Sequence, residues 1–180
     1  FEDGVRLLPQ LLGLDLRNDL FAPLGDVHCF YSDPAGGPFG IGFGVAFSVK
    51  DADKLRRTVD ALVAQGERLI SHAGLPMPVT VQRAHVDGRQ LITVPAGVFT
   101  PTVTVDDEWM VMSPFPQSVK TFFMRQDGRL PKWTPSPEHR EALTELPQSF
   151  SAISIDDPRS SMASLYGFVP IINSSMHTMM

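Results

Sequence analysis

The chain has 180 residues, 43% of them hydrophobic, and a formal net charge of −5 at pH 7. This hydrophobic share is ordinary for globular proteins and excludes general disorder, while the negative charge argues against a nucleic-acid-binding protein, which needs a basic surface to meet phosphates. No apolar run is long enough to cross a membrane, so we expect no membrane-spanning segment in this region. The single cysteine, Cys29, cannot form an internal disulfide.

The first elements predicted along the chain are two short helices followed by two strands. A leucine stripe at helical spacing over residues 7–12 predicts the first helix. Asp15 is placed to cap the second. Residues 27–32 and 39–48 are rich in strand-forming residues and enclose a glycine- and proline-rich loop, so they predict a hairpin.

A helix and two further hairpins are expected next. Asp51 is placed to cap a helix that Gly66 would end, because glycine favours the position just past a helix C-terminus. Residues 79–95 predict a hairpin turning at the dipeptide Asp87-Gly88. Residues 100–114 predict another, with its turn near Asp106 and Asp107.

The last third of the chain predicts helices separated by a proline-rich stretch. Ser113 and Pro114 are expected to begin a helix that continues to residue 126 and stops at Gly128. Ser136 is placed to cap a short helix. A strand over 149–155 and a final helix over 157–172 complete the chain.

This order of elements predicts an α+β fold. Short hairpin loops require antiparallel neighbours, so we expect an antiparallel sheet of hairpins with helices packed on one face. We expect one α+β module over residues 1–130, a proline-rich linker over 131–137, and the start of a second, incomplete module over 138–180. The chain begins at Phe1 rather than Met, and we interpret it as part of a longer polypeptide.

The strand expected over residues 39–48 alternates bulky and small residues. A dinucleotide-binding fingerprint starting at Gly40 would need glycine at Val45, and glycines inside a strand lack the strand-to-helix turn of such sites. We instead expect the bulky face to be buried and the small face to lie under a close backbone or to form an interaction surface. The bulky face consists of Phe39, Ile41, Phe43, Val45 and Phe47. The predicted interaction surface consists of Gly40, Gly42 and Gly44.

No motif of a catalytic or metal site is present in the sequence. The histidines show no metal-ligand spacing, and no serine lies in a G-x-S-x-G motif. His28 and His85 lie in expected strands and could meet in space, but nothing pairs them with a particular aspartate. The acidic cluster at residues 106–108 is most simply a solvated turn. We therefore predict no catalytic residue, no bound metal and no cofactor.

Three segments resemble a bacterial family of unknown function, DUF3352, found in predicted exported or lipid-anchored proteins. The matching segments are residues 13–25, within LLGLDLRNDLFAPLGD, 49–62, within FSVKDADKLRRTVDALVAQ, and 109–123. The resemblance implies a location outside the cytoplasm, in the periplasm or cell envelope. The family supplies no catalytic residues.

Taken together, these observations predict a non-enzymatic binding or assembly module of a larger exported cell-envelope protein. Its expected partner is another protein or the remainder of a longer chain. One alternative is a ligand carrier with an apolar pocket, and another is a hydrolase-like enzyme domain whose site forms only in three dimensions. The carrier pocket would be lined by Phe43, Phe47, Phe122 and Phe123. A broad exposed apolar patch would favour assembly over either alternative.

Overall fold

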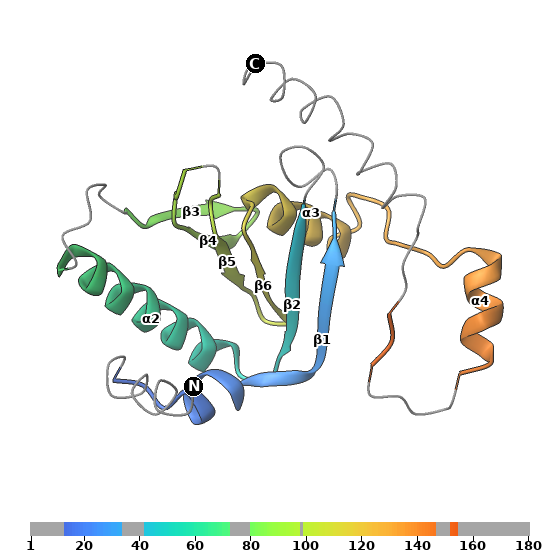
Figure 1. Ribbon diagram of the computed structural model, residues 1–180, viewed down its shortest axis with the longest axis horizontal. Helices are drawn as coiled ribbons and strands as arrows, with labels where there is room; N and C mark the ends of the chain where they lie inside the picture. The colour runs from blue at the N-terminus through green and yellow to red at the C-terminus, as the bar shows by residue number, and fades with distance from the viewer. Residues whose placement is uncertain (1–12, 34–41, 73–79, 98, 147–151, 155–180) are drawn as a thin grey trace, which may run out of the picture. The chain divides into compact units, whose positions relative to one another are not determined.

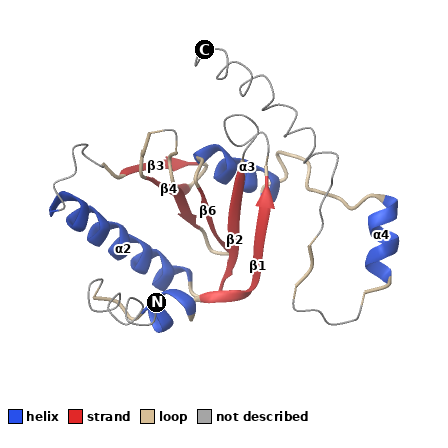
Figure 2. Cartoon of the chain, viewed as in Figure 1, coloured by secondary structure: helices blue, strands red, loops and turns tan. Residues whose placement is uncertain are grey.

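The protein was examined in a computed structural model that describes residues 13–33, 42–72, 80–97, 99–146 and 152–154. One antiparallel sheet of six strands, in the order β1-β2-β6-β5-β4-β3, dominates the fold (Figure 1). The strands are β1 (Leu24–Ser32), β2 (Phe43–Val49), β3 (Gln82–Val86), β4 (Arg89–Thr93), β5 (Thr102–Val105) and β6 (Trp109–Ser113). The helical elements are η1 (Leu16–Phe21), α2 (Ala52–His72), α3 (Pro116–Gln126) and α4 (Pro137–Thr144) (Figure 2). The predicted α+β class with an antiparallel sheet is confirmed.

The chain divides into two compact units, Phe1–Lys120 and Thr121–Met180. The sheet, η1 and α2 belong to the first unit, α4 belongs to the second, and α3 spans the division. Residues 131–136 form neither helix nor strand. The predicted limits of a first module, a linker and a second module stay predictions.

Local turn chemistry explains both β-hairpins that the sequence predicted in the middle of the chain. Asp87 and Gly88 have φ angles of 52° and 78°, and positive φ at both central residues belongs to the two-residue turn that matches strand twist. In the next hairpin, the Asp106 carboxylate accepts hydrogen bonds from the backbone N–H groups of Glu108 at 2.9 Å and Trp109 at 2.7 Å. Both predicted hairpins are confirmed.

Side-chain caps begin three helical elements where the sequence placed them. Asp15 accepts from Arg17 N at 3.0 Å, Asp51 accepts from Lys54 N at 2.9 Å, and Ser136 accepts from His139 N at 3.2 Å. Each oxygen satisfies a donor that the helix itself leaves unpaired. A glycine ends α3 as predicted. Gly128, just past the C-terminus of that helix, has a φ of 75°.

Two predicted helix boundaries were wrong. Gly66 lies inside α2, which continues to His72; the good helix formers Glu67, Arg68 and Leu69 offset the modest cost of one internal glycine. Ser113 does not cap α3 but is the last residue of β6, and its hydroxyl donates to the Phe43 carbonyl at 2.6 Å. That cross-strand bond holds Ser113 in the sheet.

Some predicted elements cannot be compared with the structure. The helix over 7–12, most of the loop over 33–38 and the final helix over 157–172 lie outside the described residues. Of the strand predicted over 149–155, residues 152–154 are described, and they lie in no strand.

Strand register sorts the side chains of the sheet onto two faces. The face toward α2, called the open face below, carries Phe43, Val45, Phe47, Met110 and Met112, because Val45 opposes Met112 and Phe47 opposes Met110. Part of this face packs against α2. The core cluster formed there consists of Leu24, Leu55, Val59, Ile92 and Met110. The opposite face, called the packed face, carries Tyr31, Gly44, Ala46, Thr104 and Val111.

The start of α3 contacts the packed face. Tyr31 Oη donates a hydrogen bond to the Ser118 carbonyl oxygen at 3.1 Å. The helices are therefore divided between the two faces rather than gathered on one. Ala46 and Val111 are both 0% exposed, so this face is fully covered around them.

The burial of β2 differs from the sequence expectation on the bulky face. Gly44 and Ala46 on the small face are buried, whereas Phe43 on the bulky face is 36% exposed and Val45 is half-buried. The Tyr31 ring explains the difference, because a Cβ added to Gly44 would lie 2.4 Å from Tyr31 Oη. A close side chain, rather than a close backbone, is what the glycine accommodates.

Candidate functional site

Two adjoining hollows lie on the open face of the sheet. The larger, called the apolar hollow below, has a volume of about 430 Å³, and the smaller, called the polar pocket, has a volume of about 200 Å³. Ile92 and Val103 line both of them. Both lie beside α2, which contributes Val63 to the apolar hollow and Arg56 and Val59 to the polar pocket.

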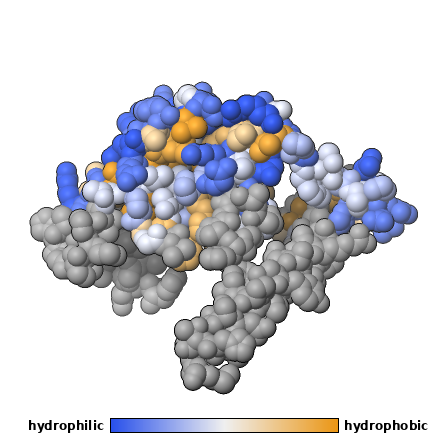
Figure 3. All heavy atoms as spheres, turned by 90° about the horizontal axis from the view of Figure 1, so that it is seen from above, coloured by the Kyte–Doolittle hydropathy of each residue, from blue (hydrophilic) through white to orange (hydrophobic). Residues whose placement is uncertain are grey.

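The apolar hollow is assembled from side chains far apart in the sequence. Its main lining residues are Phe43 and Val45 of β2, Val63 of α2, Ile92 of β4, Val103 of β5 and Met112 of β6. Phe43 and Met112 at its border are 36% and 38% exposed. Figure 3 shows hydrophobic residues gathered among hydrophilic ones on one side of the molecule. Because Phe43 and Met112 at its border are exposed, the hollow is open to solvent, and its lining is almost entirely apolar.

Aromatic rings extend this apolar surface beyond the hollow. Phe30 of β1 lies with its ring centroid 6.0 Å from that of Phe43, and Phe43 lies 6.4 Å from Phe115. Phe115 in turn lies 5.7 Å from Phe99. Phe30 and Phe99 are 72% and 53% exposed, so the aromatic row reaches solvent at both ends.

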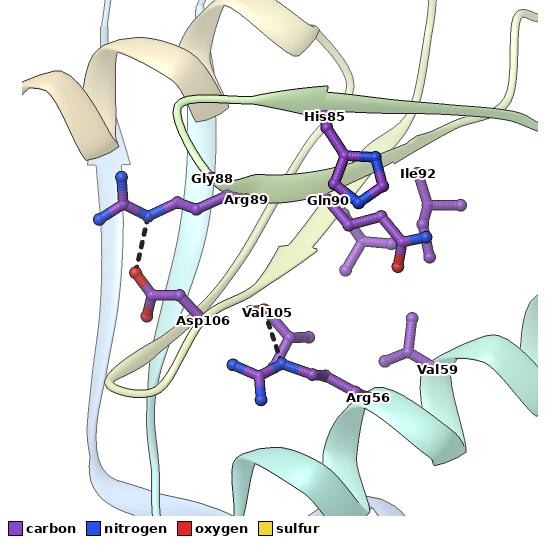
Figure 4. Close-up of a pocket in the computed structure, with 10 residues that line it drawn as sticks. Arg56, Val59, His85, Gly88, Arg89, Gln90, Ile92, Val105 and Asp106 are labelled. Atoms are coloured by element: carbon purple, nitrogen blue, oxygen red, sulfur yellow. Dashed lines mark hydrogen bonds and ion pairs between the residues drawn. The ribbon is translucent and has the colours of Figure 1, made fainter.

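The polar pocket lies between α2 and the β3–β4 hairpin (Figure 4). Arg56 and Val59 project from α2, and His85 and Gln90 extend toward them from the two strands of the hairpin. Arg56 Nε donates to the Val105 carbonyl oxygen at 3.3 Å. These residues give the pocket donors and acceptors that the apolar hollow lacks.

The charges around the polar pocket are already paired with one another. The Arg56 guanidinium contacts Asp107 at 2.5 Å and Asp53 at 3.1 Å, and the hydrogen bond with Asp107 is the main cause of a raised Arg56 pKa. Arg89 Nε lies 2.9 Å from Asp106 Oδ2. An anionic ligand would have to displace these carboxylates, so the pocket does not have the character of an anion site.

The described residues give no arrangement typical of catalysis. Among them, no group of three or more His, Cys, Asp or Glu side chains is placed to hold a metal ion. Asp15 and Asp26 have lowered pKa values, caused chiefly by hydrogen bonds from Asn18 and Lys50 respectively, and both carboxylates are fully exposed. Shifts of this kind reflect surface pairing rather than activation of a catalytic group.

The candidate site residues considered from the sequence are dispersed. Gly40 lies outside the described residues, Gly42 is buried just before β2, and Gly44 lies beneath Tyr31 while its strand segment borders the apolar hollow. Whether these glycines form an interaction surface stays a prediction. His28 and His85 lie in β1 and β3, at opposite edges of the sheet, and do not meet.

The acidic cluster and the expected carrier pocket also differ from the sequence expectation. Asp106 pairs with Arg89 and is only 19% exposed, so it is not simply solvated, whereas Asp107 pairs with Arg56 and is still 87% exposed. Of the four phenylalanines expected to line one pocket, Phe43 lines the apolar hollow and Phe47 packs on the core cluster. Phe122 and Phe123 contact each other in the second unit.

Sequence reasoning missed Val63 and Met112 as lining residues. Both belong to apolar stripes that, taken alone, predict an ordinary core position. The only available signal was the alternation of β2 and β6, and it could not show that α2 leaves this part of the open face uncovered.

Comparisons with known proteins add no relative. No protein-family model, curated protein or solved structure matches the chain. Over the part of the chain that the structure describes, no helix combines the length and apolar character needed to cross a membrane.

Proposed function

We propose that this chain is a non-enzymatic binding module that holds an apolar segment of a protein partner in the apolar hollow. The observation that carries the proposal is an open hollow of about 430 Å³ with Phe43 and Met112 exposed at its border. Contiguous apolar surface of this kind on a folded chain marks an interaction site more often than chance exposure.

The energetic basis is burial of apolar surface. Each square ångström of apolar surface removed from water stabilises a complex by about 25 cal/mol before the costs of association. The hollow is lined by valine, isoleucine and methionine side chains with few polar atoms. Transfer of an apolar segment from water into the hollow is therefore favourable. Methionine at the border adds adaptability, because its flexible thioether can adjust to different apolar partners.

The wider setting of the proposal comes from the sequence. The resemblance of residues 13–25, 49–62 and 109–123 to the DUF3352 family supports a module of a larger exported cell-envelope protein. The partner would then be another envelope protein or a further part of the same polypeptide.

A ligand carrier is the second candidate function. The volume of the apolar hollow, about 430 Å³, lies within the range of roughly 300–1,000 Å³ typical of small-molecule pockets. A carrier pocket usually encloses most of its ligand's surface. The border of this hollow is open, with Phe43 and Met112 exposed, so the first candidate function is favoured.

The experiment is a selection of linear peptides from a displayed library on the immobilised chain, followed by affinity measurements with the selected peptides. We expect apolar peptides whose affinity falls about tenfold or more in Met112→Lys, because a charge at the border must be desolvated. Leu69→Lys is the matched control, since Leu69 is also an exposed apolar residue, at 46%, but does not line the hollow.

Two results would contradict the proposal. One is equal binding of the selected peptides by Met112→Lys and Leu69→Lys. The other is native mass spectrometry showing one-to-one complexes with palmitate or lysophosphatidylcholine while no peptide binds, which would favour the carrier. Thermal unfolding of both variants checks that the substitutions leave the fold intact.

A further inference from the structure

Among the residues that the structure describes, the sheet has two edge strands, β1 and β3, and they differ in how they are protected. β3 has five residues and carries Arg83 and His85, with Arg83 positioned 3.8 Å from Asp60 of α2. β1 has nine residues, and no Asp, Glu, Lys or Arg occurs from Val27 to Ser32. Natural proteins usually protect a sheet edge with charges, proline or short length. β3 follows this rule, and the second half of β1 does not.

The register of β1 shows which of its backbone groups point away from the sheet. Asp33 N donates to the Gly42 carbonyl oxygen at 2.7 Å, and this pair continues the register in which Tyr31 opposes Gly44. Hydrogen-bonded and non-hydrogen-bonded pairs alternate along an antiparallel ladder. The N–H and C=O groups of His28, Phe30 and Ser32 are therefore directed outward, at the open edge.

Two apolar side chains along this edge are exposed to solvent. Phe30 is 72% exposed and Val27 is 56% exposed, and the thiol of Cys29 makes only a weak contact of 3.7 Å to the Phe30 carbonyl oxygen. Phe30 lies on the open face next to Phe43. A strand added beside β1 would cover the Phe30 ring and supply partners for the outward backbone groups.

We propose that β1 is a docking edge for an extended, uncharged segment of a partner protein, which pairs with residues 28–32 as an additional strand of the sheet. An extended backbone is the one chemical group that presents donors and acceptors at the spacing of His28, Phe30 and Ser32. The lack of charge between Val27 and Ser32 matches a segment without charged residues, since a charge directly opposite this edge would lose water without gaining a partner.

A second copy of the chain fits this edge less well. The register of β1 shifts between Leu24 and His28, so a twofold pairing of two β1 strands would use only the regular residues 28–32. One short strand pair buries far less than the 1,200 Å² or so that stable interfaces need. A flexible partner segment can add contacts beyond the strand. This inference concerns a surface distinct from the apolar hollow and does not require the hollow to be occupied.

The test is amide hydrogen exchange by NMR on the intact chain, titrated with a blocked hexapeptide of alternating threonine and valine. We expect the amides of His28, Phe30 and Ser32 to gain protection of about tenfold or more, while those of Cys29 and Tyr31, already paired with β2, change little. The same peptide with lysine in place of valine should give no protection.

Two variants separate edge pairing from general binding. Ser32→Pro removes an outward N–H without removing a bond to β2, and proline is tolerated at sheet edges, so the fold should remain while peptide protection is lost. Phe30→Lys should lower the affinity for the peptide about tenfold. Phe99→Lys is the matched control, because Phe99 is likewise an exposed phenylalanine, at 53%, and lies outside β1.

Three outcomes would overturn the inference. The peptide could fail to protect the β1 amides, or it could perturb Val45 and Met112 while leaving β1 unchanged, which would assign binding to the hollow alone. Alternatively, sedimentation of the chain without peptide could show a dimer that Ser32→Pro dissociates, which would make a second copy the occupant of the edge.

Discussion

The two faces of the sheet are built from the same strands but differ in how completely they are covered. On the packed face, Ala46 and Val111 are 0% exposed, whereas Phe43 and Met112 on the open face are 36% and 38% exposed. Neighbouring residues of one strand, such as Val111 and Met112, therefore share a backbone and experience opposite environments. The difference indicates that the packed face is covered more completely than the part of the open face around Phe43 and Met112.

The largest effect is expected where the packed face is tightest. In Gly44→Val, the new Cβ would lie 2.4 Å from Tyr31 Oη, and the ring is held by its hydrogen bond to the Ser118 carbonyl. We expect a loss of about 3 kcal/mol in the free energy of unfolding, measured by urea denaturation, because the ring must leave its site.

Gly66→Ala is the control for this substitution. Gly66 lies inside α2, and nothing lies within 4 Å of a Cβ added there. Alanine should therefore stabilise the protein by about 0.5–1 kcal/mol through helix propensity. Equal effects of the two substitutions would show that the packed face is not as tight as the structure indicates.

A smaller effect separates two neighbours on β6. Val111→Ala removes methyl groups from a site that is 0% exposed, whereas Met112→Ala truncates a side chain that is 38% exposed. We expect losses of about 2 kcal/mol for Val111 and less than about 1 kcal/mol for Met112. Chemical denaturation of both variants under one condition measures the difference, and a larger loss for Met112 would mean that the open face contributes more to stability than its exposure indicates.

The smallest effect is a gain in stability on the packed face. Thr104 is 1% exposed, and its hydroxyl has no hydrogen-bond partner within the described parts of the chain. Thr104→Val keeps the shape of the side chain and removes the unpaired group, so thermal unfolding should show a gain of up to about 1 kcal/mol. A loss of stability would show that the hydroxyl finds a partner in solution.

Elements set by local chemistry were predicted well from the sequence. The Asp87-Gly88 turn, the caps at Asp15, Asp51 and Ser136, and the stop at Gly128 each depend on a few neighbouring residues. The failures at Gly66 and Ser113 have different causes. At Gly66 the residues that follow outweigh one glycine, and at Ser113 a bond to Phe43, distant in the sequence, decides the conformation.

The candidate site was much less predictable than the fold. Alternation in β2 correctly separated Phe43 and Val45 from Gly44 and Ala46, but the bulky face that was expected to be buried leaves Phe43 exposed. Periodicity reports which residues share a face, and it does not report what lies against that face. Met112 and Val63 line the apolar hollow because of the position of α2, which periodicity does not report.

The sequence by itself thus determined the α+β class, the hairpins and their turns, and most helix limits, since these depend on interactions between residues close in the chain. The tertiary structure alone decided which face of β2 is covered, where the apolar hollow lies and which sheet edge is unprotected. Those features depend on how Tyr31, α2 and α3 pack against strands far from them in sequence. Packing between distant segments leaves no periodic signal in any one of them.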